Sequence, residues 1–196
     1  MIFKKGYRAG YFAFSLCSIL IILSVVLSSC GTCDVELDTA IENIATYEFG
    51  DSRESLTIVA DLVSSSNGFP SIRSNLEKQL ASVLESDDAT LGCKDFICRQ
   101  LAVMGTDESI PQLEKMLSDA ATTDMARYAL ETNTSPRACE ALRNALGSAE
   151  GKALIGIINT LGNRKNSGNA DALRGLADSS DEDVSSAVAA ALEKIE

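Results

Sequence analysis

The chain has 196 residues, with 28 acidic and 17 basic side chains and a formal charge of −11 at pH 7. No basic stripe interrupts this acidity, which argues against a nucleic-acid partner, because binding to phosphates needs clustered positive charge. The sequence contains no histidine, which excludes histidine-dependent catalysis and removes the commonest zinc ligand.

The first thirty residues predict an export signal. Lys4, Lys5 and Arg8 form a basic start, and an almost wholly apolar run of 17 residues follows, from Tyr11 to Leu27. The tetrad Leu27-Ser28-Ser29-Cys30 resembles the bacterial lipobox, which implies a signal peptide over residues 1–29 and lipid attachment at Cys30. The alternative is an uncleaved signal anchor, since 17 apolar residues lie at the short edge of what can span a bilayer.

Lipidation at Cys30 implies a mature protein tethered to the cell envelope by its N-terminal lipid. Gly31, rather than aspartate, follows the cysteine, and in well-studied lipoprotein sorting this resembles an outer-membrane address. Removal of residues 1–29 takes away three basic residues and no acid, which leaves 14 bases against 28 acids and a charge of −14. Such an acidic surface is, by default, a solubility device.

Residues 30–88 predict helices of irregular pattern. Apolar spacing favours one helix over 34–47, a second over about 52–65, and a third that begins at Pro70. Since these segments lack a clean repeat, we interpret residues 30–88 as a capping region.

A leucine repeat organises residues 89–196. Leading leucines recur at spacings of 29, 31 and 31 residues, each with an apolar residue four positions earlier, and the first three have a second leucine 12 positions later. Such a unit predicts a helix pair that buries its apolar stripe only by stacking on copies of itself. In the first pair, helices are expected over 89–104 and 107–117, and Ser135-Pro136 and Asp181 are suitable helix starts. The leading leucines are Leu101, Leu130, Leu161 and Leu192; the second leucines are Leu113, Leu142 and Leu173; the preceding apolar residues are Ile97, Ala126, Ile157 and Val188.

Three segments carry a family resemblance: PQLEKMLSD at 111–119, ARYALE at 126–131 and DSSDEDVSSAVAAAL at 178–192. They resemble bacterial HEAT repeats, of the short type found in phycobilin-lyase-related proteins and many exported proteins. The resemblance covers about residues 90–196. It implies an all-α, right-handed HEAT-like α-solenoid of antiparallel helix pairs that binds protein, and it carries over no catalytic residue.

The sequence offers no candidate catalytic, cofactor-binding or metal-binding residues. The segment 147–152 is glycine-containing but lacks the spacing of a phosphate loop and is typical of a turn. Four cysteines follow Cys30, and a disulfide is plausible in an oxidising compartment. We favour buried thiols, because Cys93 and Cys98 on one unbroken helix would be too far apart to bridge. The four are Cys33, Cys93, Cys98 and Cys139.

One row of charged residues is a candidate protein-binding strip. Glu114, Arg143 and Arg174 each follow a second-helix leucine by one position and are expected to align along one face of the stack. An ion-pair ladder between successive repeats is the alternative interpretation. The sequence therefore predicts a lipid-anchored scaffold without catalysis or cofactor, whose protein partner is unknown. A structural spacer in the envelope and a bilin-lyase-like ligand-handling enzyme are the alternatives.

Overall fold

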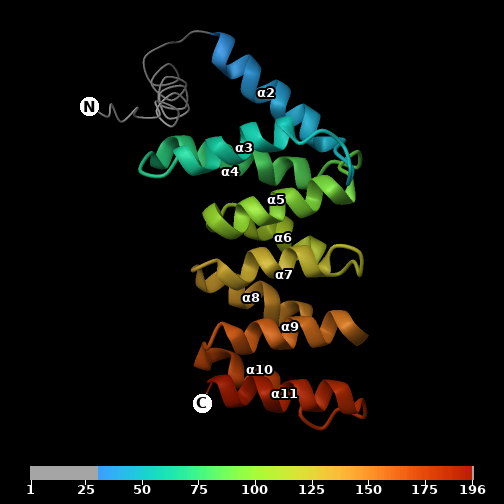
Figure 1. Ribbon diagram of the computed structural model, residues 1–196. Coiled ribbons are helices and arrows are strands. Elements are labelled where there is room, and N and C mark those ends of the chain that lie inside the picture. Colours follow the sequence, from blue (N-terminus) through green and yellow to red (C-terminus); the bar gives the residue numbers. More distant parts are fainter. Residues whose placement is uncertain (1–30, 196) are drawn as a thin grey trace, which may run out of the picture.

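The computed structural model describes residues 31–195, with side chains from residue 37 onward. The predicted signal peptide and Cys30 lie outside these residues. Within the described part every regular element is helical, which confirms the all-α prediction. Figure 1 shows the helices stacked one below another in chain order from α2 to α11.

The helix bounds follow the predicted segments closely. The largest differences are at two starts: α2 was expected from Asp34 and begins at Gly31, and α6 was expected from Asp107 and begins at Ile110. Thr106 and Ser109 lie in the turn before it, and their amides bond to a carboxylate from α4. The helices are α2 (Gly31–Ala45), α3 (Glu54–Ser65), α4 (Pro70–Leu84), α5 (Leu91–Met104), α6 (Ile110–Met116), α7 (Thr123–Thr132), α8 (Pro136–Ala145), α9 (Gly151–Asn163), the short 3-10 helix η1 (Ser167–Asn169), α10 (Ala170–Arg174) and α11 (Glu182–Ile195).

The helices form two layers. The first helices of the pairs, α3, α5, α7, α9 and α11, contact one another in succession, and the second helices α4, α6 and α8 do the same. Helix α2 packs on α3 and α4 at one end. The early pair of α3 and α4 thus continues the same two layers, although its sequence lacks the regular leucine spacing.

The leucine ladder forms the core between the layers. Leu130 and Leu161 are completely buried and Leu101 is 1% exposed. The second leucines, Leu113, Leu142 and Leu173, are all completely buried as well. Leu192 is only partly buried, because α11 is the last described helix and no further first-layer helix follows it among these residues.

Oxygen side chains begin several helices at the expected places. The Ser135 hydroxyl accepts a hydrogen bond from the Arg137 amide at the start of α8, at 3.1 Å. The Asp181 carboxylate accepts from the Asp183 amide at the start of α11, at 2.9 Å. These bonds satisfy amides that have no partner within the helix.

The first-layer helices approach each other closely where side chains are small. A Cβ atom added to Gly162 of α9 would lie 2.8 Å from both Cα and Cβ of Ala191 in α11. No larger side chain fits there without moving α11, so this glycine helps to set the separation of the last two first-layer helices.

We predict that truncating a ladder leucine costs stability in proportion to its burial. Leu161→Ala should lower the free energy of unfolding by about 2–5 kcal/mol, the range for a buried leucine. Leu192→Ala is the matched variant and should cost about half as much, because Leu192 is partly exposed. Chemical denaturation measures both, and equal losses would contradict the assigned packing.

Candidate functional site

The predicted strip residues lie on second-layer helices or at their ends. Glu114 of α6 accepts a hydrogen bond from the Asn144 amide of α8, with 2.9 Å between Oε1 and Nδ2. Arg143 of α8 donates to Asn169 Oδ1, just before α10, also at 2.9 Å. Two of the three strip residues therefore bridge successive helix pairs.

Arg174 is the exposed member of the strip. Its guanidinium lies 2.9 Å from the Asp171 carboxylate one turn earlier, and about half of the side chain is exposed. Glu114 and Arg143 are half-buried. The strip thus presents only part of its charge to solvent, and Arg174 is its most accessible cation.

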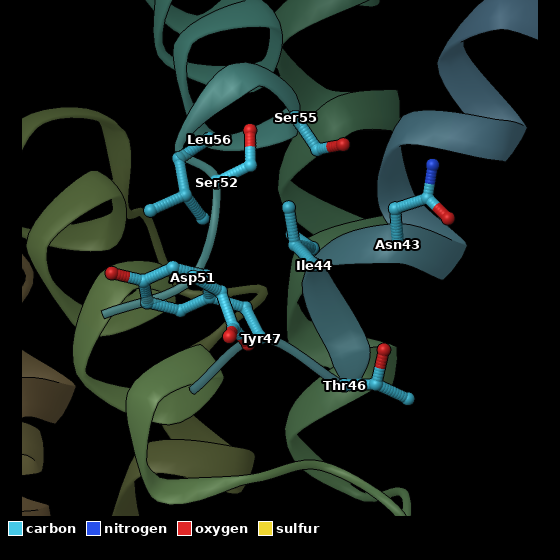
Figure 2. Close-up of a pocket in the computed structure, with 8 residues that line it drawn as sticks. All are labelled: Asn43, Ile44, Thr46, Tyr47, Asp51, Ser52, Ser55 and Leu56. Atoms are coloured by element: carbon cyan, nitrogen blue, oxygen red, sulfur yellow. The ribbon is translucent and has the colours of Figure 1, made fainter. Parts of the chain in front are cut away.

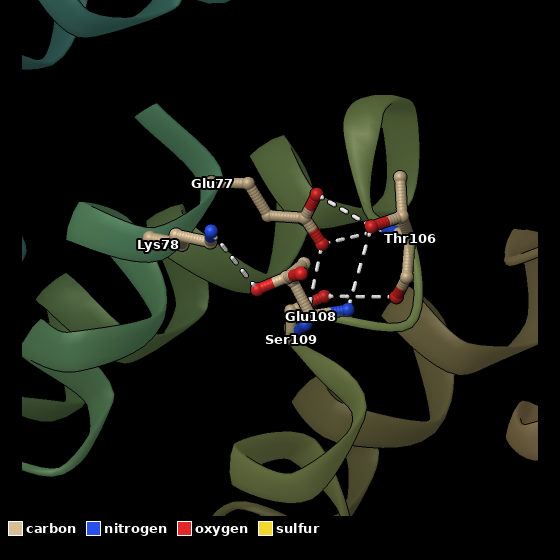
Figure 3. Close-up of polar contacts among 5 residues, drawn as sticks. All are labelled: Glu77, Lys78, Thr106, Glu108 and Ser109. Carbon is tan, nitrogen blue, oxygen red and sulfur yellow. Dashed lines mark hydrogen bonds and ion pairs between the residues drawn. The ribbon is translucent and has the colours of Figure 1, made fainter. Parts of the chain in front are cut away.

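A buried carboxylate joins α4 to the turn before α6. Glu77 is 1% exposed, and its oxygens accept from the Thr106 amide at 2.6 Å, the Thr106 hydroxyl at 2.9 Å and the Ser109 amide at 3.2 Å (Figure 3). Beside it, an exposed ion pair joins Lys78 to Glu108 at 3.5 Å. Because several donors satisfy the buried charge, Glu77 acts as a cap on α6 supplied by the preceding helix pair.

Similar polar contacts tie later turns together. Asn133 donates to the Thr106 carbonyl at 3.0 Å, 27 residues earlier. Arg164 donates to the carbonyls of Leu130, Glu131 and Ser135, which lie at and after the end of α7. Arg164 thereby satisfies carbonyls left open at the C-terminal end of α7. Ser135 is the N-cap residue of α8, and Thr106 lies in the turn after α5.

Sequence reasoning missed these contacts, although a signal was present. Asn133 and Arg164 each stand three residues after a leading leucine. The equivalent positions in the first and last units hold Met104 and Ile195, which are apolar. A polar residue at a position that is apolar in other copies of the repeat indicates a buried hydrogen-bonding role.

The cysteines resolved with side chains are buried, unpaired thiols. Cys93 and Cys98 lie on the single helix α5, and Cys139 lies on α8. Burial raises the pKa of Cys93 to about 11, and burial followed by the nearby Asp95 charge raises the pKa of Cys98 to about 12. Both thiols are therefore protonated at neutral pH, and our preference for buried thiols over disulfides is confirmed for these three residues.

A pocket of about 220 Å³ lies between the end of α2 and the start of α3 (Figure 2). Ile44 and Leu56 supply apolar walls, and the other lining residues are polar or amphipathic. Asp51 is held in place because its Oδ2 accepts the Glu48 amide at 2.9 Å. The remaining lining residues are Asn43, Thr46, Tyr47, Ser52 and Ser55.

The described residues contain no group of three or more cysteine or acidic side chains that could hold a metal ion. Over 31–195, no helix has the length and apolarity needed to cross a bilayer. Comparison with protein-family models and with curated sequences returned no match. The resemblance to HEAT repeats therefore rests on the residues of this chain.

We predict that Glu77→Ala destabilises the protein by about 1–3 kcal/mol, because it leaves the amides of Thr106 and of the buried Ser109 without this acceptor. Lys78→Ala is the matched control on the same helix. Its ion pair with Glu108 is about half exposed, so its loss should cost at most about 1 kcal/mol. Urea denaturation compares the two, and equal midpoints would show that Glu77 does not act as the cap of α6.

Proposed function

We propose that this protein is a lipid-anchored scaffold of the cell envelope, whose stacked helix pairs form a HEAT-like α-solenoid that binds another protein. The observation that carries the proposal is the two-layer stack, in which first-layer helices contact first-layer helices in succession and second-layer helices likewise. Such a stack exposes a long face relative to its core, which favours extended contacts over an enclosed reaction site.

The tether is supported by the sequence before the described residues. The lipobox-like tetrad ends at Cys30, and α2 begins at Gly31. In our proposal the helical domain therefore follows the lipidated residue directly, on the outer membrane, and the stack extends from that anchor.

The second-layer helices supply the proposed contact face, with Glu114, Arg143 and Arg174 as its charged strip. Arg174 is the most accessible of the three, and cations are scarce on this acidic chain. A partner with complementary acidic groups would bind such a strip with a higher association rate and greater specificity.

A structural spacer is the second candidate, and one observation favours it. Glu114 and Arg143 form hydrogen bonds between successive helix pairs, so these two residues serve the stability of the stack. If the strip has only this stabilising role, the domain acts as a spacer between components of the envelope and needs no partner on this face.

The tether makes a direct prediction. Cys30→Ser should abolish lipid attachment, because only the thiol can take the lipid, and the precursor should accumulate unprocessed. Cys33→Ser is the matched control, three residues away, and should be processed normally. Metabolic labelling with a fatty-acid probe reads both variants. A Cys30→Ser protein that is still labelled and processed would refute the lipoprotein assignment.

The scaffold role is tested by site-specific photo-crosslinking in intact envelopes. A photoreactive residue at Glu140 or Arg174, on the second layer, should give one discrete protein adduct, and the same residue at exposed Ala190 of the first layer should give none. Arg143→Glu should weaken the Glu140 adduct. The scaffold proposal is wrong if neither second-layer position gives an adduct, and that result would favour the spacer.

A further inference from the structure

We infer that one edge of the stack, formed by residues 46–53 and 85–91, binds a basic polypeptide segment that carries apolar side chains. The inference deepens the proposed scaffold function by stating the chemistry of a partner, and it rests on that function. It concerns a different surface from the charged strip on the second layer. Three independent features of this edge converge: exposed apolar side chains, a polar pocket, and uncompensated acidic charge.

The exposed apolar part consists of Phe49, Leu91 and Tyr47, which we call the edge patch. Phe49 is 68% exposed and Leu91 is 47% exposed. The half-buried Tyr47 ring meets the Phe49 ring edge-on, with 6.4 Å between centroids. Leu91 precedes Gly92, which lies against the Tyr47 carbonyl and ring, so the backbone brings it to the same edge. Exposed apolar and aromatic side chains on one edge favour a contact surface.

The two segments that form the edge patch are bonded to each other. The Thr90 amide donates to the Ala45 carbonyl at 3.1 Å, and the Thr90 hydroxyl donates to the Tyr47 carbonyl. A Cβ added to Gly92 would lie 2.7 Å from the Tyr47 carbonyl oxygen, so α5 meets this loop with no space between them. The patch is therefore preorganised, which lowers the entropy lost when a partner binds.

The pocket beside Tyr47 suits a cationic side chain. Its lining offers the hydroxyl oxygens of Thr46, Ser52 and Ser55 together with the Asp51 carboxylate (Figure 2). These oxygens can all accept hydrogen bonds, and an ammonium or guanidinium group supplies only donors. The Tyr47 ring on the same wall offers an aromatic face or edge to the aliphatic stem or the charged head of a lysine or arginine.

Charge around the patch has one dominant sign. Besides Glu85, which pairs with Lys115, five exposed acidic residues lie in or beside the two segments, against one exposed basic residue, Arg53. A partner segment of positive charge is therefore attracted, and nucleic acid or an anionic lipid surface is repelled. A second copy of this chain is repelled as well, because it would bring the same acids to the interface. The five acids are Glu48, Asp51, Glu54, Asp87 and Asp88.

The test is a fluorescence-anisotropy titration of the purified, detergent-solubilised full-chain product with a labelled octapeptide of alternating lysine and leucine. Two further peptides serve as probes, one alternating glutamate with leucine and one alternating lysine with glycine. The lysine–leucine peptide should bind at least tenfold more tightly than either, because the surface offers acids and an apolar patch together. Equal binding of the glutamate–leucine peptide, or no binding of the lysine–leucine peptide, would overturn the inference.

Matched variants locate the binding surface. Phe49→Ser and Asp51→Asn should each weaken binding of the lysine–leucine peptide about tenfold. Val103→Ser removes an apolar side chain that is 71% exposed on α5, and Asp183→Asn removes an acid at the far end of the stack, so neither should change binding. Equal losses in these controls would show non-specific attraction and refute the edge patch as the site.

This titration is independent of the proposed tether and strip. It needs neither lipid at Cys30 nor an adduct on the second layer, so a failed titration beside a normal Cys30→Ser result would reject only the edge patch. Circular dichroism melting of Phe49→Ser should match that of the parent protein, because Phe49 is exposed, and this comparison separates loss of binding from loss of folding.

Discussion

The whole structure depends on apolar stripes that a single helix pair cannot bury. Each unit presents a leading leucine and an apolar residue one turn earlier, and the first three units add a second leucine on the partner helix. Only the neighbouring units complete the burial, so Leu130 and Leu161 are fully enclosed and the terminal Leu192 is not. The two layers, their order and the extended outer surface all follow from this requirement.

Polar side chains then fix how successive pairs meet. Glu77 caps a turn of the next pair, and Asn133 and Arg164 reach back to carbonyls of the preceding one. The hydrophobic effect has no preferred direction, so burial alone would tolerate small rotations of one helix pair against the next. Hydrogen bonds at the helix ends require particular distances and angles and therefore restrict such rotations. The face that a partner meets is therefore defined by these contacts as much as by the leucines.

Sequence periodicity was sufficient to predict most helices, the buried ladder and the buried thiols. These features are local or repeat at a fixed spacing, so 3.6-residue periodicity and capping residues identify them. The contacts of Glu77 with Thr106 and Ser109 were missed, because they join residues 29 and 32 positions apart in the sequence. The edge patch was missed for the same reason, since it arises where residues 46–53 meet the start of α5. Contacts between residues so far apart in the sequence depend on how successive helix pairs are rotated relative to one another. The spacing of apolar residues along the chain does not specify that rotation.

Each helix pair is stabilised mainly by its contacts with the neighbouring pairs, so a defect in one pair weakens its neighbours and not distant pairs. Hydrogen exchange of the Leu161→Ala protein under native conditions tests it most directly. Loss of amide protection should be greatest in α9, smaller in α7 and α11, and absent in α3 and α4. A uniform loss of protection across all of these helices would instead show a single cooperative unit and would contradict the account.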